Sequence, residues 1–322
     1  MTALYLDRHG VKVGCARGKL TLKDPGGEEQ ALPLHTIDHI VVVGHSHFSH
    51  DAIAALLREN ITVIFSSTRG GYRGMLSGSC GHQIGRRQAH YLAMKSTEQR
   101  AVFARALVQA KLRGQARLLR QWKLPACHEI AAALMASHHC SDLAVLRGHE
   151  GIAARAFFAG LRQHLEGSPF VFEQRRQHPP SDPVNALLSL TYTLLLNEME
   201  LGVAASGLDA AGGFFHEPED GRPALLMDLI EPLRPLADRL CARLLKHELA
   251  PDDFAQEDGT CHMADGRRGI LYKAWERLLG EQVAWRGEQT TWRRLIHLQA
   301  REVVHWLEGS IPVPKFWHLD DA

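Results

Sequence analysis

Three carboxylates and one histidine in this chain have the side-chain types that bind a divalent metal ion. Asp228 and Glu231 are three residues apart, so both project from one side of the chain once it turns helical. His216 precedes them in the glycine-rich stretch GLDAAGGFFHEPED, and Glu150 heads the segment HEGIAARAFF on the same helical face as Phe157. That face is apolar, and an inward carboxylate needs a partner or a metal because burying an isolated charge is costly. Carboxylates with one imidazole suit Mg²⁺ or Mn²⁺, and such a site suits phosphodiester chemistry.

Each of these residues also has a purely structural interpretation. Glu150 could lie at a helix N-terminus, where the helix dipole favours acids. Asp228 could be an N-cap with Glu231 as an ordinary acid of the first turn. His216 is one of 20 histidines and could simply be exposed. Spacing leaves both interpretations open, because the metal hypothesis requires Glu150 to converge with the other residues.

Basic and polar residues near these positions form a predicted DNA-binding set. The basic ones lie in the first helical stretch, close after Glu150 and in a proline-rich loop, and two further polar residues share one face of a later helix. The alternatives are a solvated surface for the basic residues, a salt bridge for Arg155 and core hydrogen bonding for Asn185 and Tyr192. The set is Arg86, Arg87, Lys111, Arg113, Arg155, Arg175, Arg176, Asn185 and Tyr192.

Composition describes an ordinary globular protein. With 322 residues, 45% hydrophobic, 23% charged and a net charge of +1, the chain is neither disordered nor collagen-like, and its length favours two domains. A near-neutral chain binds nucleic acid only through local basic clusters. The six cysteines are scattered, and the histidines and cysteines at Cys127 and at 138–140 match no zinc template, which favours reduced thiols. Without a signal peptide or an apolar run of about 18 residues, we expect a cytoplasmic protein with no membrane association.

The positioning elements change character near residue 80. Before it, short alternating or apolar segments such as VKVGCA, HIVVVG and TVIFSS predict strands, and HDAIAALLREN predicts one helix capped by Ser49 or Asp51. After it, helical periodicity dominates. The predicted architecture is α+β, with a β-rich, sandwich-like domain over 1–80, a linker over 81–90 and a larger all-α domain over 91–322. Helices are predicted over 98–122, 125–138, 141–148, 150–165, 183–206, 227–248, 267–285 and 289–308.

The chain resembles the CRISPR-associated integrases of spacer acquisition, the Cas1 family, along nearly its whole length. The matching phrases are LYLDRHGVKVG, LPLHTIDHIVVVGHSHFSHDAIAALLRENITVIF, GHEGIAARAFF, DPVNALLSLTYTLL and GLDAAGGFFHEPEDGRPALLMDLIEPLRPLADR. The family often carries a tyrosine where this chain has Phe157, which removes a hydroxyl there and leaves packing intact.

The resemblance implies one divalent metal in the helical domain, held by Glu150, His216 and Glu231. Asp228 is then an alternative ligand or a residue that orients His216. It also implies a homodimer formed through the β-rich domain and a small partner, Cas2, that bridges two dimers.

The function expected from these residues is that of a metal-dependent DNA integrase and endonuclease. It would join the 3′-hydroxyl ends of short double-stranded fragments to a CRISPR repeat by transesterification. Two alternatives stay open: a stand-alone metal-dependent nuclease for branched DNA, and a non-catalytic DNA-binding scaffold in which the acids cap helices.

Overall fold

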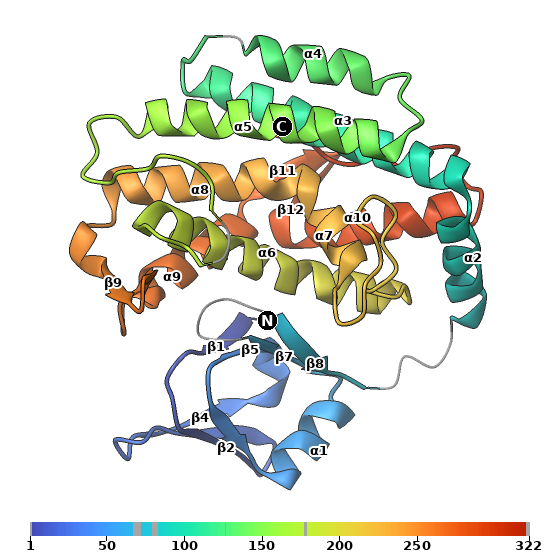
Figure 1. Ribbon diagram of the computed structural model, residues 1–322. Coiled ribbons are helices and arrows are strands. Elements are labelled where there is room, and N and C mark those ends of the chain that lie inside the picture. Colours follow the sequence, from blue (N-terminus) through green and yellow to red (C-terminus); the bar gives the residue numbers. More distant parts are fainter. Residues whose placement is uncertain (1, 67–71, 79–82, 126, 177–178, 320–322) are drawn as a thin grey trace. The chain divides into compact units, whose positions relative to one another are not determined.

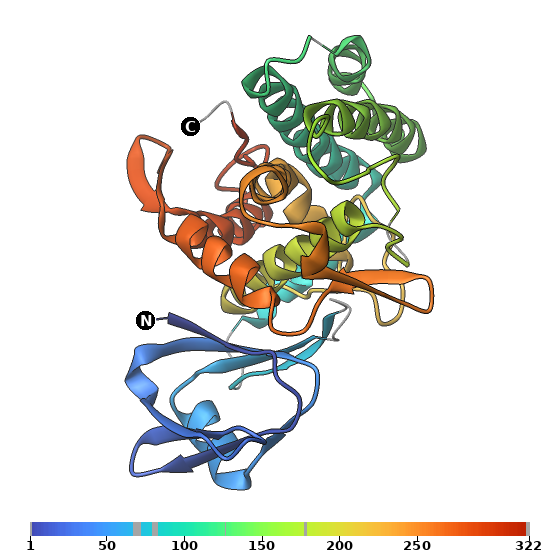
Figure 2. The same cartoon turned by 90° about the vertical axis from the view of Figure 1, so that its left-hand side faces the viewer.

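The structure is a computed structural model that describes residues 2–66, 72–78, 83–125, 127–176 and 179–319. Two compact units divide the chain, Met1–Cys80 and Gly81–Ala322 (Figures 1 and 2). The predicted boundary, with residues 81 and 82 of the predicted linker, lies outside the described residues, and helix α2 already begins at Ile84. The dimerisation and catalytic roles assigned to the two parts stay predictions.

The first unit contains two four-stranded sheets and one helix (Figure 1). One sheet has the order β1-β5-β7-β8, with β5 parallel to both β1 and β7 and β8 antiparallel to β7. The other has the order β4-β3-β2-β6 and is antiparallel except for the β2–β6 pair. The elements are β1 (Thr2–Leu6), β2 (Val11–Ala16), β3 (Lys19–Lys23), β4 (Glu29–Pro33), β5 (Ile37–Val43), β6 (Ser46–Phe48), α1 (His50–Arg58), β7 (Thr62–Ser66) and β8 (Tyr72–Leu76).

The core of this unit follows from the residue pattern of its strands. In β2 every second side chain at the start of the strand, Val11 and Val13, is buried in the core. The continuous apolar run of β5 is buried on both faces, as expected of a central strand with parallel neighbours. Helix α1 adds Leu56 to the same core, and the Ser49 hydroxyl caps it by accepting from the Ala52 N–H at 3.1 Å.

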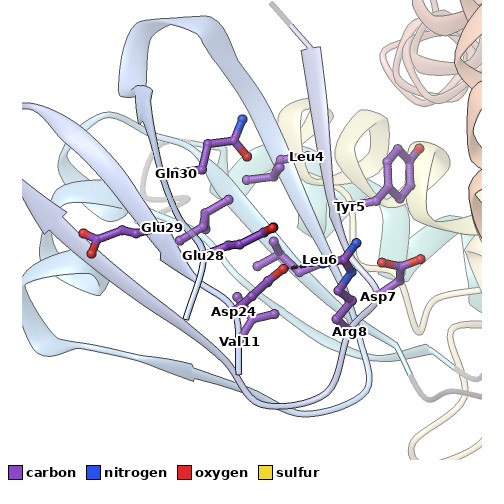
Figure 3. Close-up of a pocket in the computed structure, with 11 residues that line it drawn as sticks. Leu4, Tyr5, Leu6, Asp7, Arg8, Val11, Asp24, Glu28, Glu29 and Gln30 are labelled. Carbon is purple, nitrogen blue, oxygen red and sulfur yellow. Dashed lines mark hydrogen bonds and ion pairs between the residues drawn. The ribbon is translucent and has the colours of Figure 1, made fainter. Parts of the chain in front are cut away.

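A cavity of about 610 Å³ lies between the edge strands of the two sheets, β1 and β4 (Figure 3). Leu6 and Val11 supply apolar lining, and Glu28 lies among the polar residues at the cavity. The Arg8 guanidinium pairs with Asp24 there. This unit holds none of the predicted metal or DNA-binding residues.

The second unit is mostly helical, which together with the first unit confirms the predicted α+β fold class. Helices α3, α4 and α5 lie side by side (Figure 1). Two short antiparallel hairpins, β9–β10 and β11–β12, add to the helices of a region predicted to be all-α. The helices are α2 (Ile84–Lys95), α3 (Thr97–Gln121), α4 (His128–Ser137), α5 (Leu143–His164), α6 (Pro183–Ser206), α7 (Ala224–Ile230), α8 (Arg234–His247), α9 (Arg268–Gly280) and α10 (Trp292–Leu307); the hairpin strands are β9 (Phe254–Glu257), β10 (Thr260–Met263), β11 (Gln282–Trp285) and β12 (Glu288–Thr291).

Helix α6 is the buried centre of this unit. The Asp182 carboxylate caps its start by accepting from the Asn185 N–H at 2.9 Å, and Gly207 ends it in the left-handed region at φ 72°. Gly202 allows α10 to approach closely, since a Cβ there would lie 2.8 Å from the Cα of His297. None of the helices in the described part of the chain combines the length and apolar character needed to span a lipid bilayer.

Candidate active site

A cavity of about 580 Å³ in the second unit gathers most of the predicted functional residues. Helices α3, α5, α6 and α8 line it together with the loop that carries His216 and the short 3-10 turn η2 (Glu231–Leu233). The predicted residues that line it are Lys111, Glu150, Arg155, Arg175, Tyr192, His216 and Glu231.

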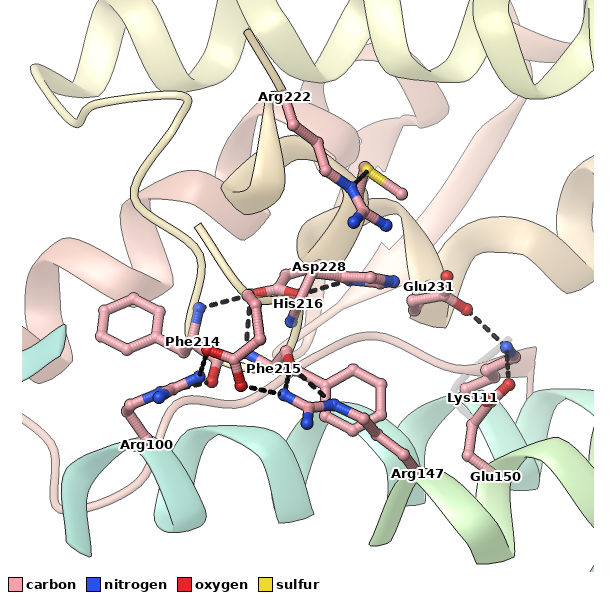
Figure 4. Close-up of polar contacts among 12 residues, drawn as sticks. Arg100, Lys111, Arg147, Glu150, Phe214, Phe215, His216, Arg222, Asp228 and Glu231 are labelled. Atoms are coloured by element: carbon pink, nitrogen blue, oxygen red, sulfur yellow. Dashed lines mark hydrogen bonds and ion pairs between the residues drawn. The ribbon is translucent and has the colours of Figure 1, made fainter. Parts of the chain in front are cut away.

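Glu150 and Glu231 meet at the ammonium group of Lys111 (Figure 4). Lys111 Nζ lies 2.5 Å from Oε2 of Glu231 and forms a second ion pair with Oε1 of Glu150. The Lys111 and Glu231 side chains are each 5% exposed, and that of Glu150 is 19% exposed. Two carboxylates that are distant in the sequence therefore converge on one buried cation.

The helix-terminus interpretations of Glu150 and Asp228 are wrong, whereas Glu231 does lie in the first turn of η2. Helix α5 is a single helix from Leu143, where 141–148 and 150–165 were predicted as two, and Asp142 caps it. Glu150 therefore lies beyond its first turn. Helix α7 begins at Ala224, so Asp228 lies inside it and is no N-cap.

The charges around Glu231 fix its ionisation. Burial alone would raise the pKa of this carboxyl, but the positive charges of Arg234 and Lys111 outweigh burial and lower the pKa to about 2. Arg234 Nη1 lies 3.1 Å from Oε1 of Glu231. Burial would lower the pKa of Lys111, and Glu231 with Glu150 instead raises it above its ordinary value. Both partners of the pair are therefore ionised at neutral pH.

Asp228 contacts His216 (Figure 4) and is not among the residues that line the cavity. Its fully buried carboxylate lies 2.7 Å from Nδ1 of His216. It also accepts the backbone N–H groups of Phe214, Phe215 and His216 at 2.6, 3.0 and 2.8 Å. Since Nδ1 is engaged, Nε2 is the imidazole nitrogen left for a ligand in the cavity.

Arg100 and Arg147, called the arginine clamp below, also hold the loop that carries His216 (Figure 4). Arg100 of α3 donates to the Phe214 carbonyl at 2.9 Å, and Arg147 of α5 donates to the Phe215 carbonyl at 2.6 Å. Both guanidinium groups also bind the Glu217 carboxylate, at 3.0 and 2.5 Å. Backbone groups of residues 214–216 and the side chain of Glu217 thus have fixed partners, which sets the position of the imidazole.

Tyr192 and Asp238 form a buried polar pair beside the acids. The Tyr192 hydroxyl donates to Oδ1 of Asp238 at 2.5 Å. Burial raises the pKa of Asp238 to about 7, against the opposing influence of that hydrogen bond and of Arg234. The guanidinium groups of Arg175 and Arg234 lie 5.5 and 4.8 Å from the centre of the Tyr192 ring.

Asn185 anchors the loop that carries the two neighbouring arginines. Its fully buried side chain accepts from Arg175 Nη1 at 2.9 Å and from the Arg176 N–H at 2.8 Å. Asn185 therefore acts through protein contacts here, which matches the core interpretation of this residue. The Arg176 side chain is exposed and does not line the cavity.

The remaining basic residues of the predicted DNA set lie apart from the cavity. Arg86 binds Glu308 at 2.9 Å, and Arg87 and Arg113 also do not line this cavity.

Lys111 does line the cavity, but it is buried between two acids, so its predicted place on a basic helical surface is wrong. The physical reason is that α3 turns this lysine toward carboxylates of α5 and η2.

The donor set fits a hard divalent cation. Among the described residues, no three histidine, cysteine, aspartate or glutamate side chains are already close enough to hold a metal ion together. Glu150 and Glu231 nevertheless converge on a single positive charge, and the His216 imidazole faces the same cavity. Two carboxylates and one imidazole match the ligands that Mg²⁺ and Mn²⁺ accept.

Sequence reasoning missed several residues of this site. Arg234 and Asp238 follow Glu231 at helical spacing in EPLRPLAD, and this pattern could have placed them on the same face. Arg100, Arg147 and Gln115 gave no comparable signal, because only tertiary packing brings them to the loop and the cavity.

Comparison with known proteins places this site in a family context. A sequence model described as CRISPR associated protein Cas1 matches residues 4–277. The chain is 34% identical to the CRISPR-associated endonuclease Cas1 1 of Thermus thermophilus, over 86% of both chains. It is also 34% identical to a Cas4 exonuclease and Cas1 endonuclease fusion of Rhodospirillum rubrum, covering 96% of this chain and 56% of the fusion.

Solved structures share the fold. A casposase bound to its integration product superposes with a TM-score of 0.87 at 23% identity, covering 98% of this chain and 93% of that one. A Cas1 protein from Thermotoga maritima superposes with a TM-score of 0.85 at 21% identity, covering 96% and 97%. At these identities the likeness concerns the fold alone.

Proposed function

Because the chain belongs to the Cas1 family of CRISPR-associated endonucleases and integrases, we propose that it is a metal-dependent DNA integrase and endonuclease of CRISPR adaptation. In the proposed reaction a 3′-hydroxyl of a short DNA fragment attacks a phosphodiester of the repeat. A new phosphodiester bond forms, the original bond breaks, and the displaced strand leaves with its own 3′-hydroxyl. With water as the attacking group, the same site would nick DNA.

The convergence of Glu150 and Glu231 on one buried positive charge carries this proposal. Acids that merely capped helices would have no reason to meet across α5 and η2. His216 faces the same cavity, so the three proposed ligands are Glu150, His216 and Glu231. Asp228 orients His216, since its two oxygens already serve three backbone N–H groups and the imidazole.

Protein groups would do the remaining work at the cavity. A bound Mg²⁺ or Mn²⁺ would polarise the reacting phosphodiester and offset the charge that develops on it. The exposed Arg155 side chain lines the cavity and would bind a neighbouring phosphate. Arg175, held by Asn185 and Ser189, would present a fixed guanidinium to the same strand.

The proposed partners are double-stranded DNA fragments, the CRISPR repeat, a second copy of the chain and Cas2. Two joining reactions at opposite ends of one repeat require two active sites at a fixed separation, which a homodimer supplies. A solved structure described as a Cas6-RT-Cas1–Cas2 complex shares the fold with a TM-score of 0.83 at 20% identity, covering 99% of this chain and 36% of that one. This likeness of fold is consistent with Cas2 as a partner.

A joining assay tests the function. A fragment with labelled 5′ ends and free 3′-hydroxyl ends is incubated with a supercoiled plasmid that bears a repeat, and covalently joined DNA is measured with Mg²⁺, with Mn²⁺ and with EDTA. We expect joining by the wild type with metal, and its loss in Glu150→Gln, His216→Ala and Glu231→Gln while duplex binding persists. Cleavage of branched DNA without joining would replace the integrase proposal with a nuclease. Duplex binding by the wild type and all three variants, with no joining or cleavage by any of them, would favour a non-catalytic scaffold.

A further inference from the structure

The Lys111 ammonium occupies the space between the two carboxylates proposed to hold the metal (Figure 4). We propose that Lys111 is an internal counter-cation, which holds Glu150 and Glu231 together in the metal-free protein and must move aside when a divalent ion binds. This inference rests on the proposed function, and it adds a competitor for the metal that belongs to the chain itself.

The Lys111 ammonium and a divalent metal ion cannot occupy the space between the two acids together, because they would overlap and repel each other. Lys111 Nζ lies 2.5 Å from Oε2 of Glu231, whereas a Mg²⁺ ion binds carboxylate oxygens at about 2.0–2.1 Å. A metal bound to the facing oxygens of both acids would therefore overlap the ammonium. Because the side chains of Lys111 and Glu231 are each 5% exposed, water screens the repulsion between the two cations only weakly.

In the metal-free protein the Lys111 ammonium stabilises the site. The buried Glu231 and half-buried Glu150 carboxylates repel each other, and leaving the buried one without a counter-charge is strongly unfavourable. Lys111 removes that repulsion and keeps the acids in place across α3, α5 and η2. The same ion pairs are then lost when the metal binds, so they weaken the observed metal affinity.

The cavity offers the displaced lysine a second partner. Gln115 lies one turn further along α3, on the same helical face as Lys111, and is 2% exposed. Within the described part of the chain its Oε1 is buried without a hydrogen-bond partner, and its side chain lines the same cavity. A buried acceptor without a donor is unusual, and it is in reach of a lysine that rotates away from the acids. Lys111 thus has two positions, one on Glu150 and Glu231 and one on Gln115.

Mn²⁺ binding, measured by electron paramagnetic resonance on the purified full chain, tests the proposal. We expect Lys111→Met to bind Mn²⁺ at least about tenfold more tightly than the wild type. In EDTA the same variant should melt at a lower temperature than the wild type, and saturating Mn²⁺ should restore it. Lys273→Met, which removes an exposed lysine of α9, is the matched control and should change neither property. Equal or weaker Mn²⁺ binding by Lys111→Met overturns the proposal.

A second variant keeps the test decisive if Lys111→Met folds poorly. Gln115→Leu should weaken Mn²⁺ binding, because it removes the second partner of the displaced ammonium. Mn²⁺ binding by Gln115→Leu equal to that of the wild type argues against displacement onto Gln115. If neither the wild type nor any variant binds Mn²⁺, the metal assignment under the proposed function fails as well, whereas binding that is indifferent to Lys111 overturns only this inference.

Discussion

The Asp228 carboxylate holds the His216 imidazole at 2.7 Å and at the same time accepts the backbone N–H of His216 at 2.8 Å. One fully buried side chain therefore determines both the ring orientation and the local backbone of the proposed ligand. This relationship separates the roles of two acids that are close in sequence: Glu231 faces the cavity, and Asp228 supports the loop behind it.

Asp228→Ala should reduce the free energy of unfolding by at least about 3 kcal/mol, because it leaves several buried N–H groups without an acceptor. Urea unfolding of the metal-free protein measures this. Asp228→Asn, which keeps one acceptor oxygen, should lose less. If the alanine variant stays within about 0.5 kcal/mol of the wild type, Asp228 does not organise the loop.

The arginine clamp predicts a loss of metal affinity without any change in the ligands. Arg100→Met and Arg147→Met should each weaken Mn²⁺ binding by about tenfold to a hundredfold, since they release the loop that carries His216. Calorimetric titration with Mn²⁺ measures the effect. Arg162→Met, which removes an exposed arginine of the same helix α5, is the matched control. Mn²⁺ affinities equal to that of the wild type would show that His216 keeps its place without the clamp.

Asp238 predicts how stability depends on pH. Burial raises its pKa from 3.8 to about 7, so between these values the folded protein holds a proton that the unfolded chain has released. The contribution to the free energy of unfolding is full below the unfolded pKa and is lost as pH rises through the folded one, by at most about 1.4 kcal/mol per pH unit.

Asp238→Asn removes this titration and should flatten the dependence of stability on pH between about pH 4 and 7. Denaturant unfolding at a series of pH values compares the variant with the wild type. Asp252→Asn, at an exposed carboxyl of the turn Pro251–Asp253, should keep the wild-type slope. A slope that persists in Asp238→Asn assigns the titration to another group.

The proposed contact between Arg155 and a phosphate predicts how DNA affinity depends on salt concentration. Arg155→Ala should weaken duplex binding and lower the slope of log affinity against log salt by about 0.9, the value for one lost phosphate contact. Fluorescence anisotropy at several salt concentrations measures both quantities. Arg277→Ala, at an exposed arginine of α9 outside the cavity lining, should leave the slope unchanged. An unaltered slope in Arg155→Ala would remove this residue from the DNA interface.

Gly202 predicts a packing effect far from the chemistry. Gly202→Ala would place a methyl group 2.8 Å from the Cα of His297, so α6 and α10 must separate, at a loss of about 1–3 kcal/mol in stability. Apart from the helix's own backbone and the adjacent residues, nothing in the described part of the chain lies within 4 Å of where a Cβ of Gly148 in α5 would be. Gly148→Ala should therefore stabilise the helix by about 0.5–1 kcal/mol. Thermal unfolding compares them, and equal shifts would contradict the close helix contact.

Much of the fold was predictable because local patterns are strong in this chain. The apolar run of β5 and the Asp182 cap with Pro183 of α6 mark their elements directly. Strand β4 (Glu29–Pro33) was missed because its residues are exposed or half-buried and show no apolar alternation. The predicted break before Glu150 was wrong, because α5 continues through Gly148 and Gly151 despite the low helix propensity of glycine.

The candidate site was predictable only in part, for a different reason. Residue chemistry and family resemblance selected Glu150, His216 and Glu231, and those side chains do face one cavity. Lys111 was misplaced because periodicity shows which residues share a helical face and not what that face meets. A buried lysine is uncommon, and only the tertiary structure shows the two acids that neutralise it.

The wide sequence spacing of Lys111, Glu150 and Glu231 affects when the site forms as the chain folds. Lys111 and Glu150 are 39 residues apart, and Glu231 follows much later in the chain. Contacts between distant segments form late in folding, because closing long loops is entropically costly. A chain still emerging from the ribosome therefore lacks an assembled centre until α3, α5 and η2 have docked.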